Sequence, residues 1–209
     1  SIPSPKERGV VSFLATTGAS EVSKPFKVFV AGSSWPPDEE IFIRYFQEHP
    51  EWKLIIAPHV IGEDHLQQIE KMLGGIKSIR YSSLFTLHSS LQDARALIID
   101  CFGLLSSIYR YADVCYVGGG FGVSIHNTLE AAVWAKPVIF GPENKKFQEA
   151  QGLKACGGGF EIQGYDDFER LMNRFDSDAD YLADVSRKAG DYVDSLAGAT
   201  KKILSDIKL

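Results

Sequence analysis

Short apolar runs alternate with amphipathic segments along the chain from residue 27 onward. Most of each run is apolar without strict alternation, and this is typical of strands in a parallel sheet that is covered on both faces. We therefore expect the runs to form one mostly parallel sheet, with a short last strand at 159–162. The runs are residues 27–31, 52–57, 79–82, 96–99, 113–117, 137–140 and 159–162.

Segments with helical spacing lie between and after these runs. The predicted helices cover residues 38–46, 64–73, 103–111, 144–155, 166–175 and 179–209, with a break at Gly198, and Asn127 opens a further short helix. Alternation of strand and helix predicts an α/β fold, specifically a Rossmann-like three-layer α/β/α domain with a mostly parallel sheet of about six strands. We assign residues 26–209 to this domain. Residues 1–25, rich in Pro, Ser and Gly, are expected to be a linker or poorly ordered segment.

Composition narrows the function classes. The 209 residues include 44% hydrophobic residues and carry a net charge of −5, from 22 basic and 27 acidic side chains. This balance argues against a nucleic-acid partner and against docking of this segment on anionic lipid. No apolar run approaches the roughly 20 residues that span a bilayer. The three cysteines form no CxxC pair, which suits a reducing compartment.

The stretch 113–142 carries the strongest chemical signal. A buried strand leads into Gly118, Gly119, Gly120 and Gly122, and Asn127 then opens a helix. Glycines let a ligand approach the backbone closely, and exposed N–H groups at a helix start favour an anion. The stretch therefore predicts a phosphate-binding loop, which we interpret as a nucleotide-sugar site.

Polar residues also follow the other predicted strands. Because ligands bind beyond the carboxyl ends of the strands in such sheets, we expect these residues to gather on one rim. They are Ser33, Ser34, His59, residues 100–103, the loop 118–128 and residues 142–144.

Several of these residues have a purely structural alternative. Asn127 and Glu130 have the spacing of a capping box, although Glu130 could also hold ribose hydroxyls, and the two roles are compatible. His126 could contact a phosphate or simply lie exposed in a loop. His59 follows a strand end, yet an isolated histidine is more often structural. The two serines could donate to a phosphate or only initiate the turn before Pro36.

Two other motifs are weaker. A dinucleotide fingerprint starting at Gly118 would need glycine at position 123, where Val123 stands, so NAD binding is disfavoured. The glycines could also form a tight turn without a ligand. Asp176, Asp178 and Asp180 spell the DxD of metal-dependent glycosyltransferases, but they precede a helix, where acidic residues are favourable. We expect no metal site.

The central stretch resembles the signature of the 3-deoxy-D-manno-octulosonic acid (Kdo) transferases of Gram-negative lipopolysaccharide synthesis. The family pattern is an ADxxxVGG strand and loop, an HNxLE block and a KPVxxGP strand. The matching residues here are 112–113, 117–119, 126–130, 136–138 and 141–142, and the segments AGSSWPPDEE (31–40) and APH (57–59) resemble two further strand ends. The resemblance covers roughly residues 27–209.

This resemblance implies a two-domain GT-B glycosyltransferase that moves Kdo from CMP-Kdo to a lipid A precursor without a metal or other cofactor. It places the parent protein at the cytoplasmic face of the inner membrane. The catalytic glutamate, the membrane anchor and most of the acceptor site belong to the family's N-terminal half. The present chain corresponds to the C-terminal, donor-binding half, so it would hold no catalytic residue, would be soluble and would be inactive alone.

The resemblance also implies roles for individual residues. Glu130 would hold the ribose, and Asn127 with the backbone of Gly118, Gly119 and Gly120 would lie at the phosphate and Kdo. The remaining predicted contacts are Ser33 and Ser34 at the phosphate, His59 near the cytidine or phosphate, His126 at the phosphate or sugar carboxylate, and Phe102, Gly103 and Leu104 at the base.

One departure concerns charge. The family often has an arginine between the proline and histidine of the second strand end, whereas here His59 follows Pro58 directly. Two other functions remain open: a GT-B-type epimerase domain that uses a UDP-sugar, and a non-catalytic nucleotide-binding domain.

Overall fold

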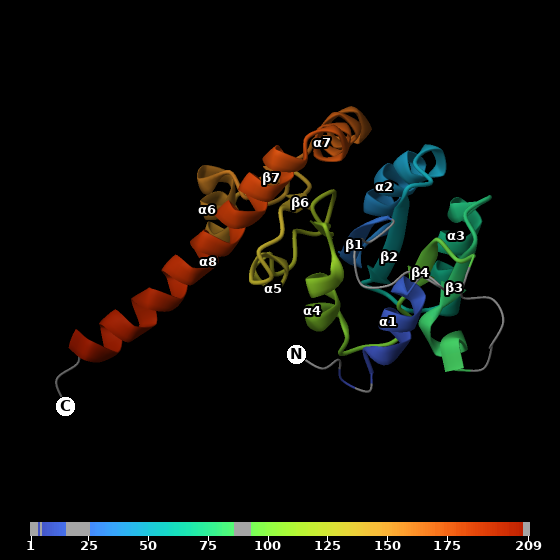
Figure 1. Cartoon of the computed structure of the whole chain (residues 1–209), viewed down its shortest axis with the longest axis horizontal. Coiled ribbons are helices and arrows are strands. Elements are labelled where there is room, and N and C mark those ends of the chain that lie inside the picture. Colours follow the sequence, from blue (N-terminus) through green and yellow to red (C-terminus); the bar gives the residue numbers. More distant parts are fainter. Residues whose placement is uncertain (1–3, 5, 16–25, 86–92, 207–209) are drawn as a thin grey trace.

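The computed structural model describes residues 4, 6–15, 26–85 and 93–206. Its centre is a sheet of seven strands in the order β3-β4-β2-β1-β5-β6-β7, and every pairing is parallel (Figure 1). The predicted α/β fold is confirmed, with seven strands in place of about six. The strands are β1 (Lys27–Ser34), β2 (Trp52–Pro58), β3 (Ser78–Arg80), β4 (Ala96–Ile98), β5 (Val114–Val117), β6 (Val138–Phe140) and β7 (Gly159–Glu161).

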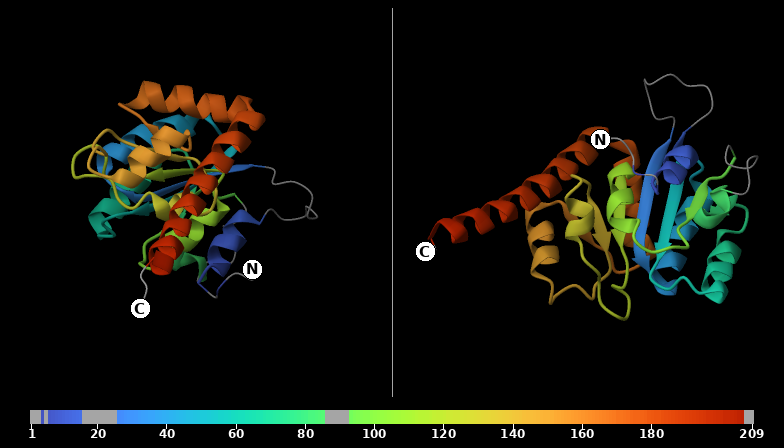
Figure 2. Two further views of the ribbon diagram at one scale, coloured as in Figure 1. Left: turned by 90° about the vertical axis from the view of Figure 1, so that its left-hand side faces the viewer. Right: turned by 90° about the horizontal axis from the view of Figure 1, so that it is seen from below.

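Helices cover both faces of this sheet and complete the three layers (Figure 2). The last helix is continuous through Gly198, so the predicted break there is wrong, and the helix extends beyond the body of the molecule (Figure 1). The helices are α1 (Arg8–Leu14), α2 (Pro36–Glu48), α3 (Glu63–Leu73), α4 (Leu105–Ile108), α5 (Leu129–Ala132), α6 (Gln148–Cys156), α7 (Tyr165–Ser177) and α8 (Ala179–Asp206), with 3-10 turns η1 (Tyr81–Phe85) and η2 (Tyr109–Tyr111).

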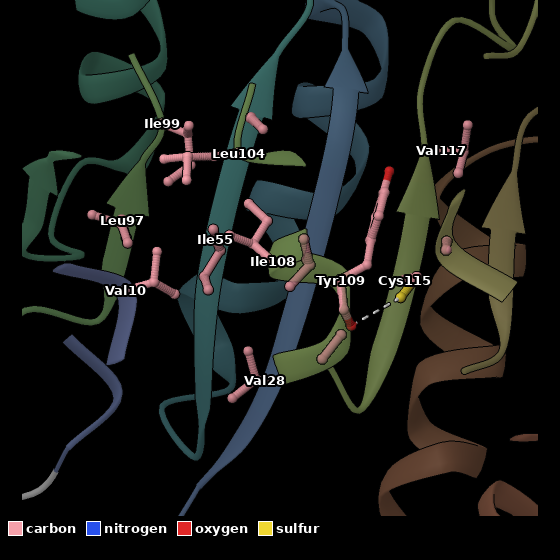
Figure 3. Close-up of a cluster of buried hydrophobic side chains, with 14 of the residues drawn as sticks. Val10, Val28, Ile55, Leu97, Ile99, Leu104, Ile108, Tyr109, Cys115 and Val117 are labelled. Atoms are coloured by element: carbon pink, nitrogen blue, oxygen red, sulfur yellow. Dashed lines mark hydrogen bonds between the residues drawn. The ribbon is translucent and has the colours of Figure 1, made fainter. Parts of the chain in front are cut away.

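The strands divide their side chains between two hydrophobic clusters, because successive residues point to opposite faces. In β1, Val28 and Val30 join the cluster beneath α1, α4, α5 and α6, while Phe29 and Ala31 join the one beneath α2, α3 and α7. Figure 3 shows part of the first cluster, in which side chains of β1, β2, β4 and β5 meet those of α1 and α4. Burial on both faces explains why the strands read as unbroken apolar runs.

The second cluster is built largely from aromatic rings. Phe29 of β1 lies with its ring centroid 4.9 Å from that of Phe46 and 5.7 Å from those of Phe42 and Phe168. Offset and edge-on ring pairs add about 0.5–1.5 kcal/mol each to the area that they bury. These contacts fix α2 and α7 on the sheet, and α2 carries part of the rim described below.

The N-terminal segment differs from the expected linker. Residues 8–14 form α1, whose Val10 and Phe13 are fully buried against the sheet. The Nζ atom of Lys53 donates to the carbonyl of Phe13, and it lies 4.4 Å from the ring centroid of Phe26. Burial lowers the pKa of Lys53. The described part of this segment is therefore a core helix, whereas residues 1–3, 5 and 16–25 lie outside the described residues.

Candidate functional site

The rim is centred on the point where the strand order reverses. The chain leaves β1 toward β2 on one side and later returns to place β5 on the other, so the loops after β1 and β5 diverge. A crevice at such a switch point is the usual ligand site of an open parallel sheet. The two loops touch through their backbones: a Cβ added to Gly118 would lie 2.4 Å from the carbonyl oxygen of Ser33. Glycine is therefore required at position 118.

A small apolar pocket opens beside this crevice, between the start of α2 and the glycine loop. Its volume is about 110 Å³, whereas whole drug-sized ligands occupy sites of about 300–1,000 Å³. The pocket can therefore take only part of a nucleotide sugar. Its lining residues are Trp35, Pro37, Asp38, Gly119, Phe121, Gly122 and Val123.

Asp38 joins three elements beneath this pocket and is only 1% exposed. One carboxylate oxygen accepts from the Tyr116 hydroxyl of β5 at 2.7 Å, and the other accepts from the backbone N–H groups of Gly119 and Trp35, both at 2.9 Å. Burial raises the pKa of Asp38, and these hydrogen bonds oppose the shift. The carboxylate thus holds the glycine loop against α2. Sequence reasoning missed this residue, although an acidic side chain at the third position of a helix is a recognisable capping signal.

The glycine loop offers fewer free amides than the sequence suggested. The N–H of Gly118 donates to the carbonyl of Gly32 at 2.9 Å, and that of Gly119 is held by Asp38. A Cβ on Gly120 would lie 2.6 Å from the backbone of Gly141, so this loop also packs tightly against the end of β6. The glycines therefore allow close backbone packing, and internal contacts fix the conformation of the loop before any ligand binds.

The helix after the loop begins later and is shorter than predicted. It starts at Leu129 and has four residues, so its dipole is a weak source of anion affinity. The side-chain oxygen of Asn127 accepts from the N–H of Leu129 at 3.0 Å, and its amide donates to Glu130 at 3.3 Å. Asn127 therefore caps this turn, but not through the predicted box with the N–H of Glu130. Asn127 is exposed and Glu130 is half-buried at the rim.

The predicted serine pair separates into two different environments. Ser34 is fully buried, and its hydroxyl donates to Glu39 at 2.8 Å. The other oxygen of Glu39 lies 2.8 Å from Nε2 of His65. Burial raises the pKa of Glu39. Ser33 is half-buried with a φ of 52°, so only the Ser33 side chain of this pair is accessible from outside the protein.

The two predicted rim histidines meet, although they are far apart in the sequence. The exposed His59 ring, after β2, stacks on Trp35 with centroids 4.8 Å apart and on His126 with centroids 4.5 Å apart. Burial lowers the pKa of His126, and the neighbouring His59 lowers it further. The Nε2 atom of His126 is buried and has no hydrogen-bond partner among the described residues.

The predicted base-binding segment follows β4, which is separated from β1 by β2. Phe102 is 74% exposed and Gly103 has a φ of 85°, so both are accessible at the same edge of the sheet. Leu104 instead packs in the hydrophobic core. Its side chain is therefore a structural contact, and only its backbone could face a ligand.

The DxD residues serve as helix and strand contacts. Asp176 forms an ion pair with Lys27 at 2.8 Å, and Asp178 accepts from the N–H of Tyr181 at the start of α8. Within residues 4, 6–15, 26–85 and 93–206, no group of three His, Cys, Asp or Glu side chains is arranged to hold a metal.

Rossmann-like sheets commonly bind nucleotides in the crevice at the switch point, and comparisons with known proteins make the class of this chain more specific. No protein-family model matches the chain. Curated relatives include 3-deoxy-D-manno-octulosonic acid transferases of Aquifex aeolicus (29% identical over 140 residues, 64% of this chain) and Chlamydia trachomatis (30% over 128 residues, 58% of this chain). A bifunctional glycosyltransferase/methyltransferase of Fusobacterium nucleatum is 28% identical over 156 residues, 73% of this chain. Kdo transferases are thus homologues of the chain, as the resemblance predicted. The matches span 37%, 28% and 24% of these three relatives.

Solved structures agree on the fold. The C-terminal CMP-Kdo binding domain of WaaA from Acinetobacter baumannii matches with a TM-score of 0.71 at 16% identity, over 81% of this chain and 90% of that domain. Anabaena HepE in complex with UDP-glucose matches with a TM-score of 0.60 at 14% identity, over 98% of this chain and 54% of that protein. The chain therefore has the fold of a GT-B glycosyltransferase domain, a fold that serves more than one nucleotide.

Proposed function

We propose that the chain is the donor-binding domain of a glycosyltransferase that moves Kdo from CMP-Kdo to a lipid A precursor. The observation that carries the proposal is the crevice between β1 and β5. There, the HNxLE block and the glycine loop meet the ends of β1 and β2 in a fold shared with the CMP-Kdo binding domain of WaaA. Sequence similarity to several Kdo transferases supports the same assignment.

Within this proposal, Glu130 accepts hydrogen bonds from the ribose hydroxyls, because a surface carboxylate can accept two O–H groups. His59, His126 and Ser33 lie around the phosphate. Phe102 and Gly103 approach the base from the end of β4. The small apolar pocket beside Asp38 receives one end of the donor. The Asp38 carboxylate fixes the glycine loop that lines this pocket.

The chemistry would be an inverting transfer. A base in the other half of the parent protein activates an acceptor hydroxyl, and the anomeric carbon of Kdo develops positive charge as CMP leaves. The present domain stabilises the departing phosphate through fixed polar donors, an electrostatic role. No metal or other cofactor takes part in this scheme. The described residues supply no catalytic base, so we expect the isolated chain to bind the donor without transferring Kdo.

The remaining partners belong to the parent protein. We infer that the lipid A precursor and the membrane contact the other half, at the cytoplasmic face of the inner membrane, and that the present domain takes no nucleic acid. Across the described ranges, none of the helices combines the length and apolarity needed to cross a bilayer.

A calorimetric titration of the chain with CMP, with UMP and NAD as controls, tests the proposal. We expect CMP to bind and UMP and NAD to bind more weakly. Preference for UMP would favour the epimerase-type alternative, because such enzymes use UDP-sugars. Kdo transfer by the purified chain would contradict the expectation that it is inactive alone.

A further inference from the structure

Three aromatic rings form a continuous stack across the crevice. Trp35 stands at the start of α2, His59 follows β2, and His126 lies in the loop after β5. His59 is the middle ring, with interplanar angles of 23° to Trp35 and 29° to His126. Three separate segments thus place two titratable rings where the proposed phosphate would lie.

The three segments that carry this stack contain no permanent cation; the adjoining loop after β6 carries Lys145 and Lys146. Residues 32–40, 58–63 and 118–130 include no lysine or arginine, but they include Asp38, Glu63 and Glu130 among their acidic side chains. A phosphate needs positive charge or N–H donors, and Gly118 and Gly119 already donate within the protein. Any positive charge that these three segments give to an anion must therefore come from the two imidazoles.

The surroundings of His126 make its charge dependent on the ligand. Its ring faces His59 from the end of β2, Asp38 from α2 and Glu130 from α5. Burial and His59 lower the pKa of His126, whereas the two carboxylates raise it. A bound anion adds a negative charge next to the stack, and negative charge favours the protonated ring. The buried, unpartnered Nε2 atom is the position where that proton would sit as a donor.

We propose that His59 and His126 form a proton-linked phosphate site, in which binding of the nucleotide's phosphate is coupled to uptake of a proton by the stack. The inference rests on the proposed function, because it takes the nucleotide of that proposal as the ligand. Trp35 supports the cationic state, since an aromatic face attracts a cation stacked on it. Protonation of both rings without a ligand is opposed by repulsion across 4.5 Å.

The sign of the pH effect follows from this coupling. The protonated stack binds the anion, so affinity is highest below the ordinary histidine pKa of about 6.5 and declines as the pH rises. An average uptake of about half a proton over this range, below one because part of the stack is already protonated near pH 6, corresponds to a loss of about tenfold in affinity between pH 6 and pH 8.

The test uses the methyl ester of CMP, a phosphodiester whose single negative charge is constant in this range, because a phosphomonoester has its own pKa near 6. Calorimetric titrations at pH 6, 7 and 8, in buffers with different ionisation enthalpies, give both the affinity and the number of protons taken up. His126→Gln and His59→Gln are compared with His49→Gln. His49 pairs with Glu51 at the opposite end of β2 and serves as the control.

We expect proton uptake and the tenfold decline in the parent chain and in His49→Gln, and a much flatter pH profile in His59→Gln and His126→Gln. His59 is exposed, so its variant remains informative if His126→Gln fails to fold. Binding that is equally tight at all three pH values, or a pH profile unchanged in the His59 variant, would overturn the inference while leaving the proposed function in place. Absence of binding at every pH would overturn both.

Discussion

The two walls of the crevice differ in how their polar groups are used. On the inner wall, Asp38 accepts three hydrogen bonds from two backbone segments and Tyr116, and Glu39 is shared by Ser34 and His65. On the outer wall, formed by the residues after β2 and β5, His59 and Asn127 are exposed and Glu130 is half-buried. Buried polar groups with complete partners stabilise a shape, whereas exposed groups keep capacity for a ligand. This difference indicates that the acidic residues after β1 stabilise the shape of the crevice. In our proposal, the more accessible side chains after β2 and β5 contact the ligand.

The largest effect on stability should come from adding a single methyl group to the glycine loop at Gly120. Gly120→Ala places a Cβ 2.6 Å from the Gly141 backbone, so we expect it to lower the free energy of unfolding by about 3 kcal/mol. Urea denaturation measures this change. Gly122→Ala is the matched control, because nothing lies within 4 Å of its added Cβ. Equal stability of the two variants would refute the close packing of the loop on β6.

Removal of the Asp38 carboxylate should have the next largest effect. Asp38→Ala leaves the Tyr116 hydroxyl and the Gly119 N–H buried without their acceptor, which costs about 2–3 kcal/mol of stability. Asp38→Asn retains one acceptor and should lose less. Urea denaturation of both variants measures the change in the free energy of unfolding, and CMP titration measures any separate change in affinity. An alanine variant as stable as the parent would show that Asp38 does not hold the loop.

On the outer wall, Glu130→Ala should reduce affinity without affecting the fold. Loss of a charged acceptor for ribose corresponds to about 2 kcal/mol, or roughly thirtyfold in CMP affinity. Glu143→Ala removes an exposed carboxylate elsewhere on the rim and is the control. If deoxycytidine monophosphate, which lacks the 2′-hydroxyl, lost the same affinity in the parent and in Glu130→Ala, the ribose contact would be wrong.

Ser34 is buried and Ser33 is partly accessible, so their alanine variants should have different effects: one on stability and the other on CMP affinity. Ser34→Ala removes a buried donor to Glu39 and should cost about 1 kcal/mol of stability. Ser33→Ala should leave the fold nearly unchanged and weaken CMP by about threefold. Thermal unfolding and calorimetry of both variants check this. Identical behaviour of the two would remove the distinction between the walls at this position.

The smallest effect is expected at Phe102. Because its side chain is 74% exposed, Phe102→Ala should change stability by less than about 0.5 kcal/mol. Loss of partial stacking on the base should weaken CMP by about twofold to threefold. Leu104→Ala is the contrasting variant, since Leu104 is buried in the core and its truncation should cost about 2–3 kcal/mol of stability. If Leu104→Ala weakened CMP binding and Phe102→Ala did not, the assignment of Phe102 to the base and Leu104 to the core would be contradicted.

The sequence predicted the fold well because burial on both faces leaves a strong signal. Continuously buried strands such as β5 (Val114–Val117) favour a parallel sheet covered by helices on both faces. The same reasoning failed at α1, whose seven residues are flanked by Pro, Ser and Gly and whose burial depends on distant contacts with Lys53 and η1. It also failed at Gly198, because α8 continues through a residue that only lowers helix propensity.

The candidate site was predicted less completely. Strand-end position was enough to select His59 and His126, but their stacking depends on how two distant loops meet. Asp38 was missed because its role is long-range, with Tyr116 78 residues away in sequence. Leu104 and Ser34 were included because neighbours in sequence can point in opposite directions, which only the packed structure resolves.

The central claim is that a cytidine nucleotide binds in the crevice between β1 and β5. The most direct measurement is a nuclear magnetic resonance titration with CMP that follows the backbone amides of the whole chain. We predict chemical-shift changes concentrated at Ser33, His59 and residues 118–130, with smaller changes at Phe102. Shifts concentrated elsewhere, for example around Arg170 and Arg174 at the β7 edge, would contradict it.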